Sequence, residues 1–498
     1  MGTVSEQLVA EFLSEYRSSG GYLRGHVARL AELAASEDEQ VAEPATRSVF
    51  TSLVEQLADS FEPGAVNVYN RAFAQVIQAC RRNPGAAPLD DNLERFGLQS
   101  EEDLIARAET LRRVSPLPLT HEWAQRMRRV IVLSRVTLGA DVAITSVIIE
   151  RMKQSFPEAE IVLVGGRKAS ELFGGDRRLQ FKEITYRRAG TTMQRLLSWI
   201  GLLKAVRDLT RELGHAEYLI VDPDTRLTQL GLLPITGEGD SSEGGPLLRP
   251  DHLFFPSREY GSSTTRSLSE LTSTWLDEVL SAKMTTYPQA CLNGGDLQSA
   301  SRVVQAIRRS RSGPIVTLNF GVGETPAKRI GDEFEQSLVS TLIRHGTTVI
   351  LDKGAGQEEI ERADRVIAAA TQIELDGRHA RVVEMREQNL TSQPDKLDAE
   401  LVVWDGRIGM LAALIGQSDL YVGYDSAGQH IAAALGVPCI DVFAGFSSAR
   451  MLERWRPTGK AETRVVAVET LTGDVSTNAV LSRVLSDASE MLSRATSL

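Results

Sequence analysis

The first 118 residues carry apolar side chains at helical spacing and show no strand pattern. In residues 4–16, Val4, Leu8 and Phe12 recur every four positions, which places them on one face of a helix. Similar stretches, separated by turns that contain proline and glycine, are residues 23–35, 47–60, 65–81 and 101–114. The pattern predicts an all-α domain over residues 1–118, with a proline-containing linker at 115–119.

From residue 130 onward, short apolar runs alternate with longer amphipathic stretches. The predicted strands are residues 130–133, 160–165, 181–184, 218–221, 315–319, 348–351, 401–403, 420–423 and 439–443. The predicted helices are residues 141–156, 167–174, 192–213, 333–345, 358–370, 408–417, 429–435 and 478–495. Such alternation is typical of parallel sheets wrapped by helices. We therefore expect an α/β protein with two Rossmann-like domains, 119–300 and 301–498, that face each other across a cleft. Residues 236–266, rich in glycine, serine and proline, are expected to form loops over that cleft.

Composition and charge exclude some classes of function. The 498-residue chain has a net charge of −11 and no basic stripe, which argues against a nucleic-acid-binding protein. Cys80, Cys291 and Cys439 lack metal-ligand spacing and indicate free thiols of a reducing compartment. No stretch is long and apolar enough to span a bilayer, and residues 1–21 are too polar for a signal peptide. We expect a cytoplasmic protein.

The clearest chemical signal is a strand–turn–helix–strand unit over residues 417–445. Its polar turn, Tyr424 to Gly428, precedes a short helix of small apolar residues. Backbone N–H groups and the positive end of the helix dipole make such a turn suitable for holding an anion. In the alternative interpretation, Asp425 or Ser426 only caps the helix.

The residues Asp425, Ser426 and Ala427, followed by His430 and the run 431–436, resemble a known signature. It is the nucleotide-binding signature of the ADP-heptose:lipopolysaccharide heptosyltransferases, glycosyltransferase family nine, which has Asp-Thr-Gly at the first three positions. Serine keeps the hydroxyl group, alanine replaces the glycine, and Gly428 follows one position later. The resemblance implies a GT-B fold, and it implies that these residues bind the donor.

A second stretch runs from Arg135 to Val142 and resembles the family pattern Arg-x-x-x-x-Gly-Asp-Val, with Ala140 in place of the glycine. The resemblance implies that Asp141 is the catalytic base, which takes the proton of the acceptor hydroxyl. It also implies that Arg135 and Thr145 lie on the acceptor side. The alternative for Asp141 is the N-cap of the helix that follows.

A third stretch is the glycine-containing loop from Asn319 to Gly323, followed by Lys328 and Arg329. It is similar to the family loop that ends in Lys-Arg/His-Trp, although Ile330 replaces the tryptophan. The resemblance implies that Lys328 meets the charge of the departing diphosphate without a metal ion, and that Gly323 and Arg329 border the donor. A solvated surface lysine is the alternative for Lys328.

Two weaker matches complete the set. The loops at 352–358 and 405–409 resemble family loops that border the nucleoside, with Gly406 as the matching glycine, and ordinary turn glycines are the alternative. Asp222-Pro223-Asp224 has the form of a metal-binding Asp-x-Asp, but it follows a strand at a place where the family has no metal site. We expect Asp222 to border the acceptor and expect no metal site.

Together these matches predict an inverting glycosyltransferase that moves a sugar from a nucleotide-diphosphate donor to an acceptor hydroxyl. ADP-heptose is one candidate donor, and the acceptor is left open between a saccharide, a lipid-linked and a protein acceptor. We expect no further cofactor. The expected location of the protein is the cytoplasm, including the inner face of the membrane. Residues 1–118 are left open between acceptor binding, self-association and docking of a protein partner. The alternatives are a non-catalytic GT-B-like scaffold and a nucleotide-sugar epimerase of the same fold.

Overall fold

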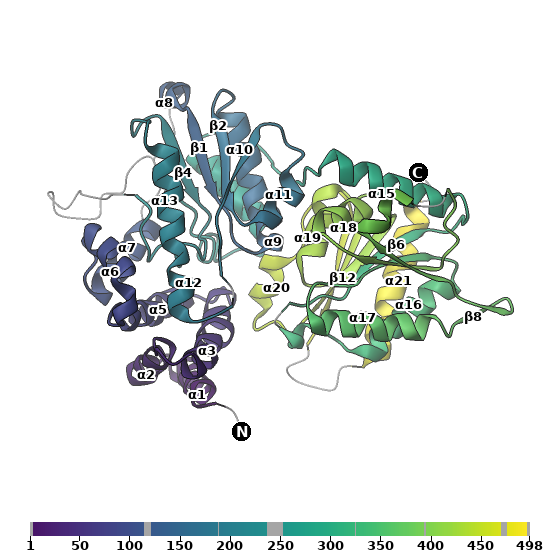
Figure 1. Ribbon diagram of the computed structural model, residues 1–498, viewed down its shortest axis with the longest axis horizontal. Helices are drawn as coiled ribbons and strands as arrows, with labels where there is room; N and C mark the ends of the chain where they lie inside the picture. The colour runs from purple at the N-terminus through teal and green to yellow at the C-terminus, as the bar shows by residue number, and fades with distance from the viewer. Residues whose placement is uncertain are drawn as a thin grey trace. The chain divides into compact units, whose positions relative to one another are not determined.

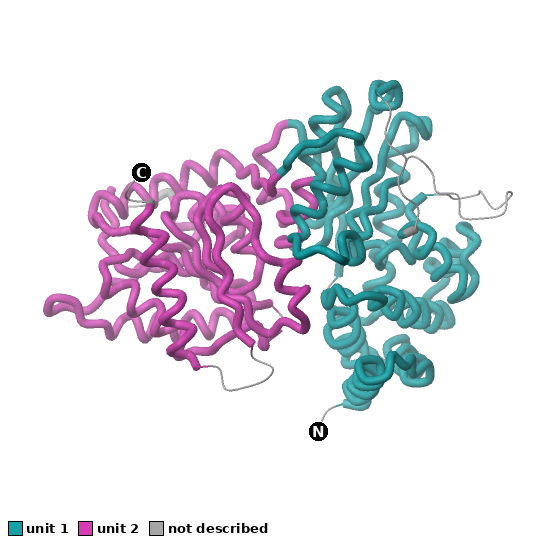
Figure 2. The backbone as a smooth tube through the Cα atoms, turned by 180° about the vertical axis from the view of Figure 1, so that it is seen from behind, with its two compact units in different colours: residues 1–137, 148–167, 178–286 teal, residues 138–147, 168–177, 287–498 magenta. Residues whose placement is uncertain are grey.

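The computed structural model describes residues 3–113, 121–187, 189–236, 252–323, 325–392, 395–469 and 476–495. The chain forms two compact units (Figure 2). Unit 1 consists of residues 1–137, 148–167 and 178–286, and unit 2 of residues 138–147, 168–177 and 287–498. The linker expected at 115–119 lies outside the described residues, as do residues 237–251 of the loops expected at 236–266. The remainder of that range contains a short strand at His252–Phe254, where only loops were expected.

The N-terminal region is helical, as predicted. Its α-helices are α1 (Val4–Ser19), α2 (Arg24–Ala34), α3 (Glu39–Arg47), α4 (Glu55–Ala58), α5 (Ala65–Arg81), α6 (Ala87–Arg95) and α7 (Glu101–Arg113), with a π-helical segment at Ser48–Val54. The sequence pattern did not predict α3 and α6. Each has only nine residues and contains a proline, Pro44 or Pro88, which reads as a helix breaker in a sequence.

The first sheet, in unit 1, is entirely parallel. Its strands are β1 (Arg129–Leu133), β2 (Glu160–Gly165), β3 (Leu179–Glu183), β4 (Tyr218–Asp222) and β5 (His252–Phe254), in the order β3-β2-β1-β4-β5. The helices along this part of the chain are α8 (His121–Arg126), α9 (Leu138–Ala140), α10 (Ser146–Ser155), α11 (Arg167–Phe173), α12 (Thr192–Leu196), α13 (Ser198–Thr210) and α14 (Leu268–Val279). The three-residue strand β5 is too short to form a recognisable pattern.

The N-terminal helices share a hydrophobic core with this first sheet. Tyr69 and Phe73 of α5 belong to the same buried cluster as Trp199 of α13 and Ile131 of β1. In Figure 1 these helices, purple to blue, lie beside α12 and α13, which they contact. The helical region is therefore packed onto the first sheet through a common core.

The second sheet, in unit 2, has seven parallel strands. They are β6 (Ile315–Asn319), β7 (Thr348–Asp352), β10 (Val382–Arg386), β11 (Leu401–Asp405), β12 (Leu420–Tyr424), β13 (Cys439–Ala444) and β14 (Thr463–Val468), in the order β10-β11-β7-β6-β12-β13-β14. A small antiparallel hairpin is formed by β8 (Glu374–Leu375) and β9 (Arg378–His379).

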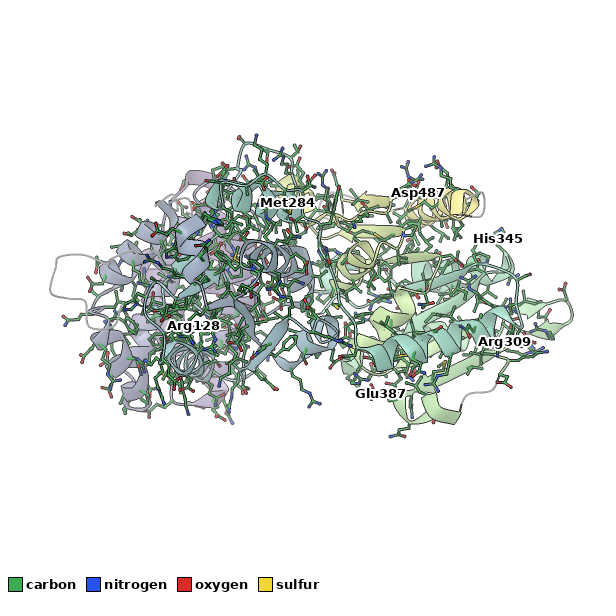
Figure 3. All side chains as sticks on the ribbon, turned by 90° about the horizontal axis from the view of Figure 1, so that it is seen from above. Arg128, Met284, Arg309, His345, Glu387 and Asp487 are labelled. Atoms are coloured by element: carbon green, nitrogen blue, oxygen red, sulfur yellow. The ribbon has the colours of Figure 1, made fainter. Side chains whose placement is uncertain are left out.

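Helices cover both faces of the second sheet (Figure 1). One face packs on α16 (Asp332–Arg344), α17 (Gln357–Ala370) and α21 (Thr477–Ala495). The other lies against α15 (Gly294–Arg308), α18 (Ile408–Ile415) and α19 (Ala427–Leu435), and α20 (Ala449–Trp455) follows β13. The C-terminal helix α21 is fixed by ion pairs as well as by its apolar face. Arg464 of β14 donates to Asp487, labelled in Figure 3, and to Glu490, both at 2.8 Å.

Each sheet has a point at which the strand order reverses direction, and such points are where open α/β sheets bind ligands. In the second sheet it lies between β6 and β12, and in the first between β1 and β4. The segments that follow these four strands contain Lys328, Asp425, Arg135 and Asp222. Among the described residues, no helix has the length and apolar character needed to cross a membrane.

Candidate donor site at the switch point of the second sheet

An ion pair joins the two loops at the switch point of the second sheet. Lys328 Nζ lies 2.5 Å from Asp425 Oδ2, and the side chains are 20% and 6% exposed. The second carboxylate oxygen, Oδ1, accepts a hydrogen bond from Gln429 Nε2 at 2.9 Å. Lys328 is thus not a solvated surface lysine. It is a largely buried cation at the carboxyl ends of β6 and β12.

The segment that carries Lys328 is held from two sides. The backbone N–H of Ile330 donates to the Tyr424 hydroxyl oxygen at 3.2 Å. On the other side, a methyl group at Gly445 would lie 2.4 Å from the Ala327 carbonyl oxygen, so only glycine allows this approach. These contacts fix the ammonium group against Asp425.

The N-terminus of α19 lies at the same place. Ser426 is the N-cap: its hydroxyl oxygen accepts from the Gly428 N–H at 3.4 Å, and its own N–H donates to Gln429 Oε1 at 2.7 Å. The capping alternative therefore holds for Ser426, whereas Asp425 pairs with Lys328. Gly428 is required by packing, because a methyl group there would lie 1.9 Å from the hydroxyl oxygen of Tyr421.

Asp141 and Thr145 also belong to unit 2, where α9 and the π-helical segment Asp141–Thr145 contact α19. The hydroxyl of Thr145 donates to Asp141 Oδ1 at 2.9 Å, and Asp141 is 2% exposed. Asp141 lies within the helix that begins at Leu138, and not at its N-cap position. A π-helical turn of this kind often marks a functional position.

The two stretches in which alanine replaces a family glycine lie against each other at Gly139, the residue before Ala140. A methyl group at Gly139 would lie 3.1 Å from Cδ2 of the His430 ring and 3.4 Å from the Cα of Ala427. Because Gly139 has no side chain, it leaves room for the ring of His430 and for the backbone of Ala427.

His430 is an uncharged part of the site. Burial lowers the pKa of His430 to about 4, with Asp425 opposing the shift and Lys328 adding to it. Its ring packs edge-on against Trp455, with 6.1 Å between the ring centres. A neutral imidazole here packs between α9, α19 and α20 without adding charge.

The other residues predicted on the donor side have different surroundings. Arg329 forms an ion pair with Asp332. It also donates to both carboxylate oxygens of Glu335, at 2.5 and 2.7 Å. The N–H of Gly323 donates to Glu359 at 3.3 Å, and a methyl group at Gly406 would lie 2.3 Å from the Trp404 ring. The adjacent Arg407 pairs with Glu387 at 2.5 Å (Glu387 is labelled in Figure 3). The guanidinium of Arg329 is therefore engaged within the protein.

The acceptor-side residues Arg135 and Asp222 lie at the switch point of the first sheet, in unit 1, and are buried. Arg135 donates to the Pro223 carbonyl at 2.5 Å and to the Ser257 hydroxyl at 2.6 Å. Burial lowers the pKa of Arg135 to about 9. Asp222 accepts from the Thr225 N–H (2.9 Å) and the Thr228 hydroxyl (2.8 Å), and burial raises its pKa to about 6.

Asp224 connects this buried cluster to the N-terminal helices. Its carboxylate lies 3.1 Å from Arg112 of α7 and 2.9 Å from Arg258, and it is fully buried. Arg258 in turn donates to the carbonyl of Ala58 in α4 at 3.0 Å. The two carboxylates of the Asp-x-Asp sequence are thus held by threonines and arginines.

One titratable residue beside the candidate donor site was not predicted. Asp441, in the middle of β13, is fully buried, and its surroundings include Asp425 and Lys328. An acidic residue inside an otherwise apolar strand was the one signal in the sequence that pointed to it.

A segment of the chain that contains part of this site is similar to a known family. Residues 384–478 match the model of glycosyltransferase family 9 (heptosyltransferase), and this stretch includes β12, the Asp425 turn and α19. The chain carries a glycosyltransferase family 9 segment. This match confirms the predicted class, a glycosyltransferase. Comparison with curated protein sequences gives no match.

A solved structure of a family 9 protein shares the fold, and two further solved structures are similar to the chain at lower TM-scores. The glycosyl transferase family 9 protein from Veillonella parvula is 15% identical with a TM-score of 0.50, over 76% of this chain and 100% of that one. The ADP-heptose lps heptosyltransferase II of E. coli is 14% identical with a TM-score of 0.47, over 74% and 99%. E. coli heptosyltransferase WaaC with ADP is 14% identical with a TM-score of 0.47, over 72% of this chain and 99% of that one. The predicted GT-B class, with two Rossmann-like sheets and helices before them, is confirmed.

Proposed function

We propose that the protein is an inverting glycosyltransferase that uses a nucleotide-diphosphate sugar, with ADP-heptose as the first candidate donor. The observation that carries the proposal is the Lys328–Asp425 pair at the switch point of the second sheet, beside the N-terminus of α19. An ammonium group and a helix N-terminus together form a site for an anion such as a diphosphate. The family 9 match over residues 384–478, which include Asp425 and α19 but not Lys328, supports the heptose assignment.

In the proposed reaction, the acceptor oxygen attacks the anomeric carbon of the sugar as its proton passes to Asp141. The bond between that carbon and the diphosphate oxygen breaks, and the electron pair leaves with the diphosphate. Lys328 and the first turn of α19 meet the added negative charge. Asp425 holds Lys328 in place, and Thr145 orients the carboxylate of Asp141 through its 2.9 Å hydrogen bond.

The reaction does not require a metal ion in this proposal, because Lys328 and α19 supply the positive charge. The acceptor is a saccharide, a lipid-linked or a protein hydroxyl, and the helical region is packed on the sheet assigned to the acceptor. The proposed location is the cytoplasm, including the inner face of the membrane.

The test is an assay with ADP-heptose and other ADP- and UDP-sugars that follows release of the nucleoside diphosphate by slow hydrolysis or transfer. Asp141→Asn should reduce this turnover ~10²–10⁴-fold, because a general base is lost, and leave ADP binding unchanged. Asp376→Asn, the same chemical change in the turn between β8 and β9, is the matched control. Turnover of Asp141→Asn within a few-fold of the wild type would contradict the assignment, and epimerised sugar as the product would contradict group transfer.

A further inference from the structure

Asp441 is a buried acid without a hydrogen-bond partner among the described residues. It is 0% exposed, and neither carboxylate oxygen has a donor within reach. It lies opposite Gly423 in the pairing of β12 with β13. Two residues before it, the thiol of Cys439 points to the carbonyl of Gln429, 3.9 Å away, so this face of β13 is covered by α19.

The groups that face Asp441 come from several elements. Asp425 follows β12 and Lys328 precedes α16, and both interact electrostatically with Asp441. Cys439 on the same strand and Tyr421 on β12 also interact electrostatically with Asp441. His430 of α19 interacts with the same Lys328–Asp425 pair. On the other side, β14 places the apolar Val465 opposite Asp441. The cluster thus contains two carboxyl groups and one ammonium group.

Elementary electrostatics decides the protonation state of Asp441. A buried carboxylate with no hydrogen-bond donor is costly, and a like charge nearby adds to the cost, so the group takes up a proton instead. Burial and the charge of Asp425 raise the pKa of Asp441 well above its usual range, and Lys328 only partly opposes them. Asp425 differs, because it has the ammonium group at 2.5 Å and the Gln429 amide at 2.9 Å.

We propose that Asp441 is protonated in the working protein and that this proton keeps Lys328 available to the donor's diphosphate. This inference rests on the proposed function. With Asp441 neutral, the Lys328–Asp425 pair has no net charge. An ionised Asp441 would give Lys328 a second carboxylate and would place an extra negative charge beside the diphosphate. Asp441 is therefore a positioning residue that acts through Lys328 and does not touch the donor.

The test is the pH dependence of ADP binding, measured by calorimetry with the full chain and ADP alone. At a pH high enough to remove the proton from Asp441, its carboxylate repels ADP, whereas Asp441→Asn remains neutral. The dissociation constant of the wild type should rise about tenfold more than that of Asp441→Asn, which corresponds to one pKa unit of coupling. The titration of ADP itself contributes equally to both proteins and cancels. Asp376→Asn, the matched control, should follow the wild type.

An infrared measurement tests the protonation state directly. At pH 7 the wild type should show the carbonyl band of a protonated carboxylic acid that is missing from Asp441→Asn. Absence of this band from the difference spectrum would overturn the proposal. Parallel pH profiles over a pH range in which the band disappears from the wild type would also overturn it. If Asp441→Asn does not fold, Asp441→Ser provides a smaller neutral side chain for both measurements. Failure of every nucleotide to bind would overturn the proposed function, and the infrared band would still decide whether Asp441 is protonated.

Discussion

At the scale of single residues, burial determines how the side chains of the candidate donor site interact with one another. Lys328, Asp425 and His430 were all readable from the sequence as a family pattern, and the structure brings them together within unit 2. Asp441 was not, because a sequence pattern shows an acid in a strand but not which charges surround it. Its environment depends on the pairing of β12 with β13 and on the path of the loop that carries Lys328.

The buried His430 predicts a measurable pH dependence of stability. Its pKa is lowered to about 4 in the folded chain, from the ordinary 6.5, so the unfolded chain binds the additional proton between these values. Stability from this residue is complete above pH 6.5 and falls as the pH falls towards 4. Between pH 7 and pH 5 the loss should be about 2 kcal/mol, since one pKa unit corresponds to 1.36 kcal/mol.

Urea denaturation at pH 5 and pH 7 measures this effect. His430→Gln should show a smaller loss of unfolding free energy between the two pH values than the wild type. His345→Gln, at an exposed position at the end of α16 (labelled in Figure 3), is the matched control and should keep the wild-type loss. An equal loss in all three proteins would show that His430 is not buried in its neutral form.

At the scale of elements, the sequence pattern predicts best where a strand or helix is regular. The strand at 315–319 and the helix at 65–81 have the predicted bounds, because each is a continuous apolar run or a sustained helical period. Several of the missed elements are short or irregular, among them α3, α6, β5, α20 and β14. The helices α14 and α15, with 12 and 15 residues, were missed as well, although they are regular. The edge strand β14 has Arg464 in its run, which weakens the apolar signal.

The attachment of α7 to the first sheet could not be predicted, because it depends on residues far apart in the chain. Arg112 reaches Asp224 at 3.1 Å and the carbonyl of Leu230 at 2.9 Å, with its side chain only 4% exposed. Sequence patterning gives the faces of helices, but it does not pair one buried charge with another. The acceptor-side residue Arg135 ends in the same cluster for this reason.

We expect Arg112→Ala to destabilise unit 1 by about 3 kcal/mol, because the buried Asp224 then keeps only Arg258 as an ion-pair partner and the carbonyl of Leu230 loses its donor. Thermal or urea unfolding measures the change. Arg29→Ala is the matched control, since Arg29 forms an exposed pair with Glu32 and should cost less than about 1 kcal/mol. Equal stability of the two variants would mean that the Asp224 cluster does not attach the helices to the sheet.

At the scale of the whole molecule, the two-sheet plan was predictable and the packing of the helical region was not. The alternation of strands and helices gave both parallel sheets, and the resemblance gave the GT-B class. The common core of α5, α13 and β1 depends on which apolar faces meet, and a linear pattern does not contain that information. Residues 1–113 are therefore better described as part of the first sheet's surroundings than as an isolated bundle.

The absence of a metal requirement is a prediction about the whole reaction. Turnover should persist in excess EDTA, because the positive charge comes from Lys328 and α19. The carboxylates of Asp222 and Asp224 are already held by Thr225, Thr228, Arg112 and Arg258. Loss of turnover in EDTA, with recovery on addition of magnesium or manganese, would place the leaving-group site elsewhere.

The most direct test of the central claim is the affinity of the protein for ADP with and without the charge of Lys328. Calorimetric titration of Lys328→Ala should give a dissociation constant at least about tenfold above the wild type, since a hydrogen bond to a charged group is worth about 1.5–3 kcal/mol. Lys396→Ala, which removes an exposed lysine of the same unit, is the matched control and should bind ADP like the wild type. Equal affinity of Lys328→Ala and the wild type would contradict the assignment of the diphosphate to the Lys328–Asp425 site.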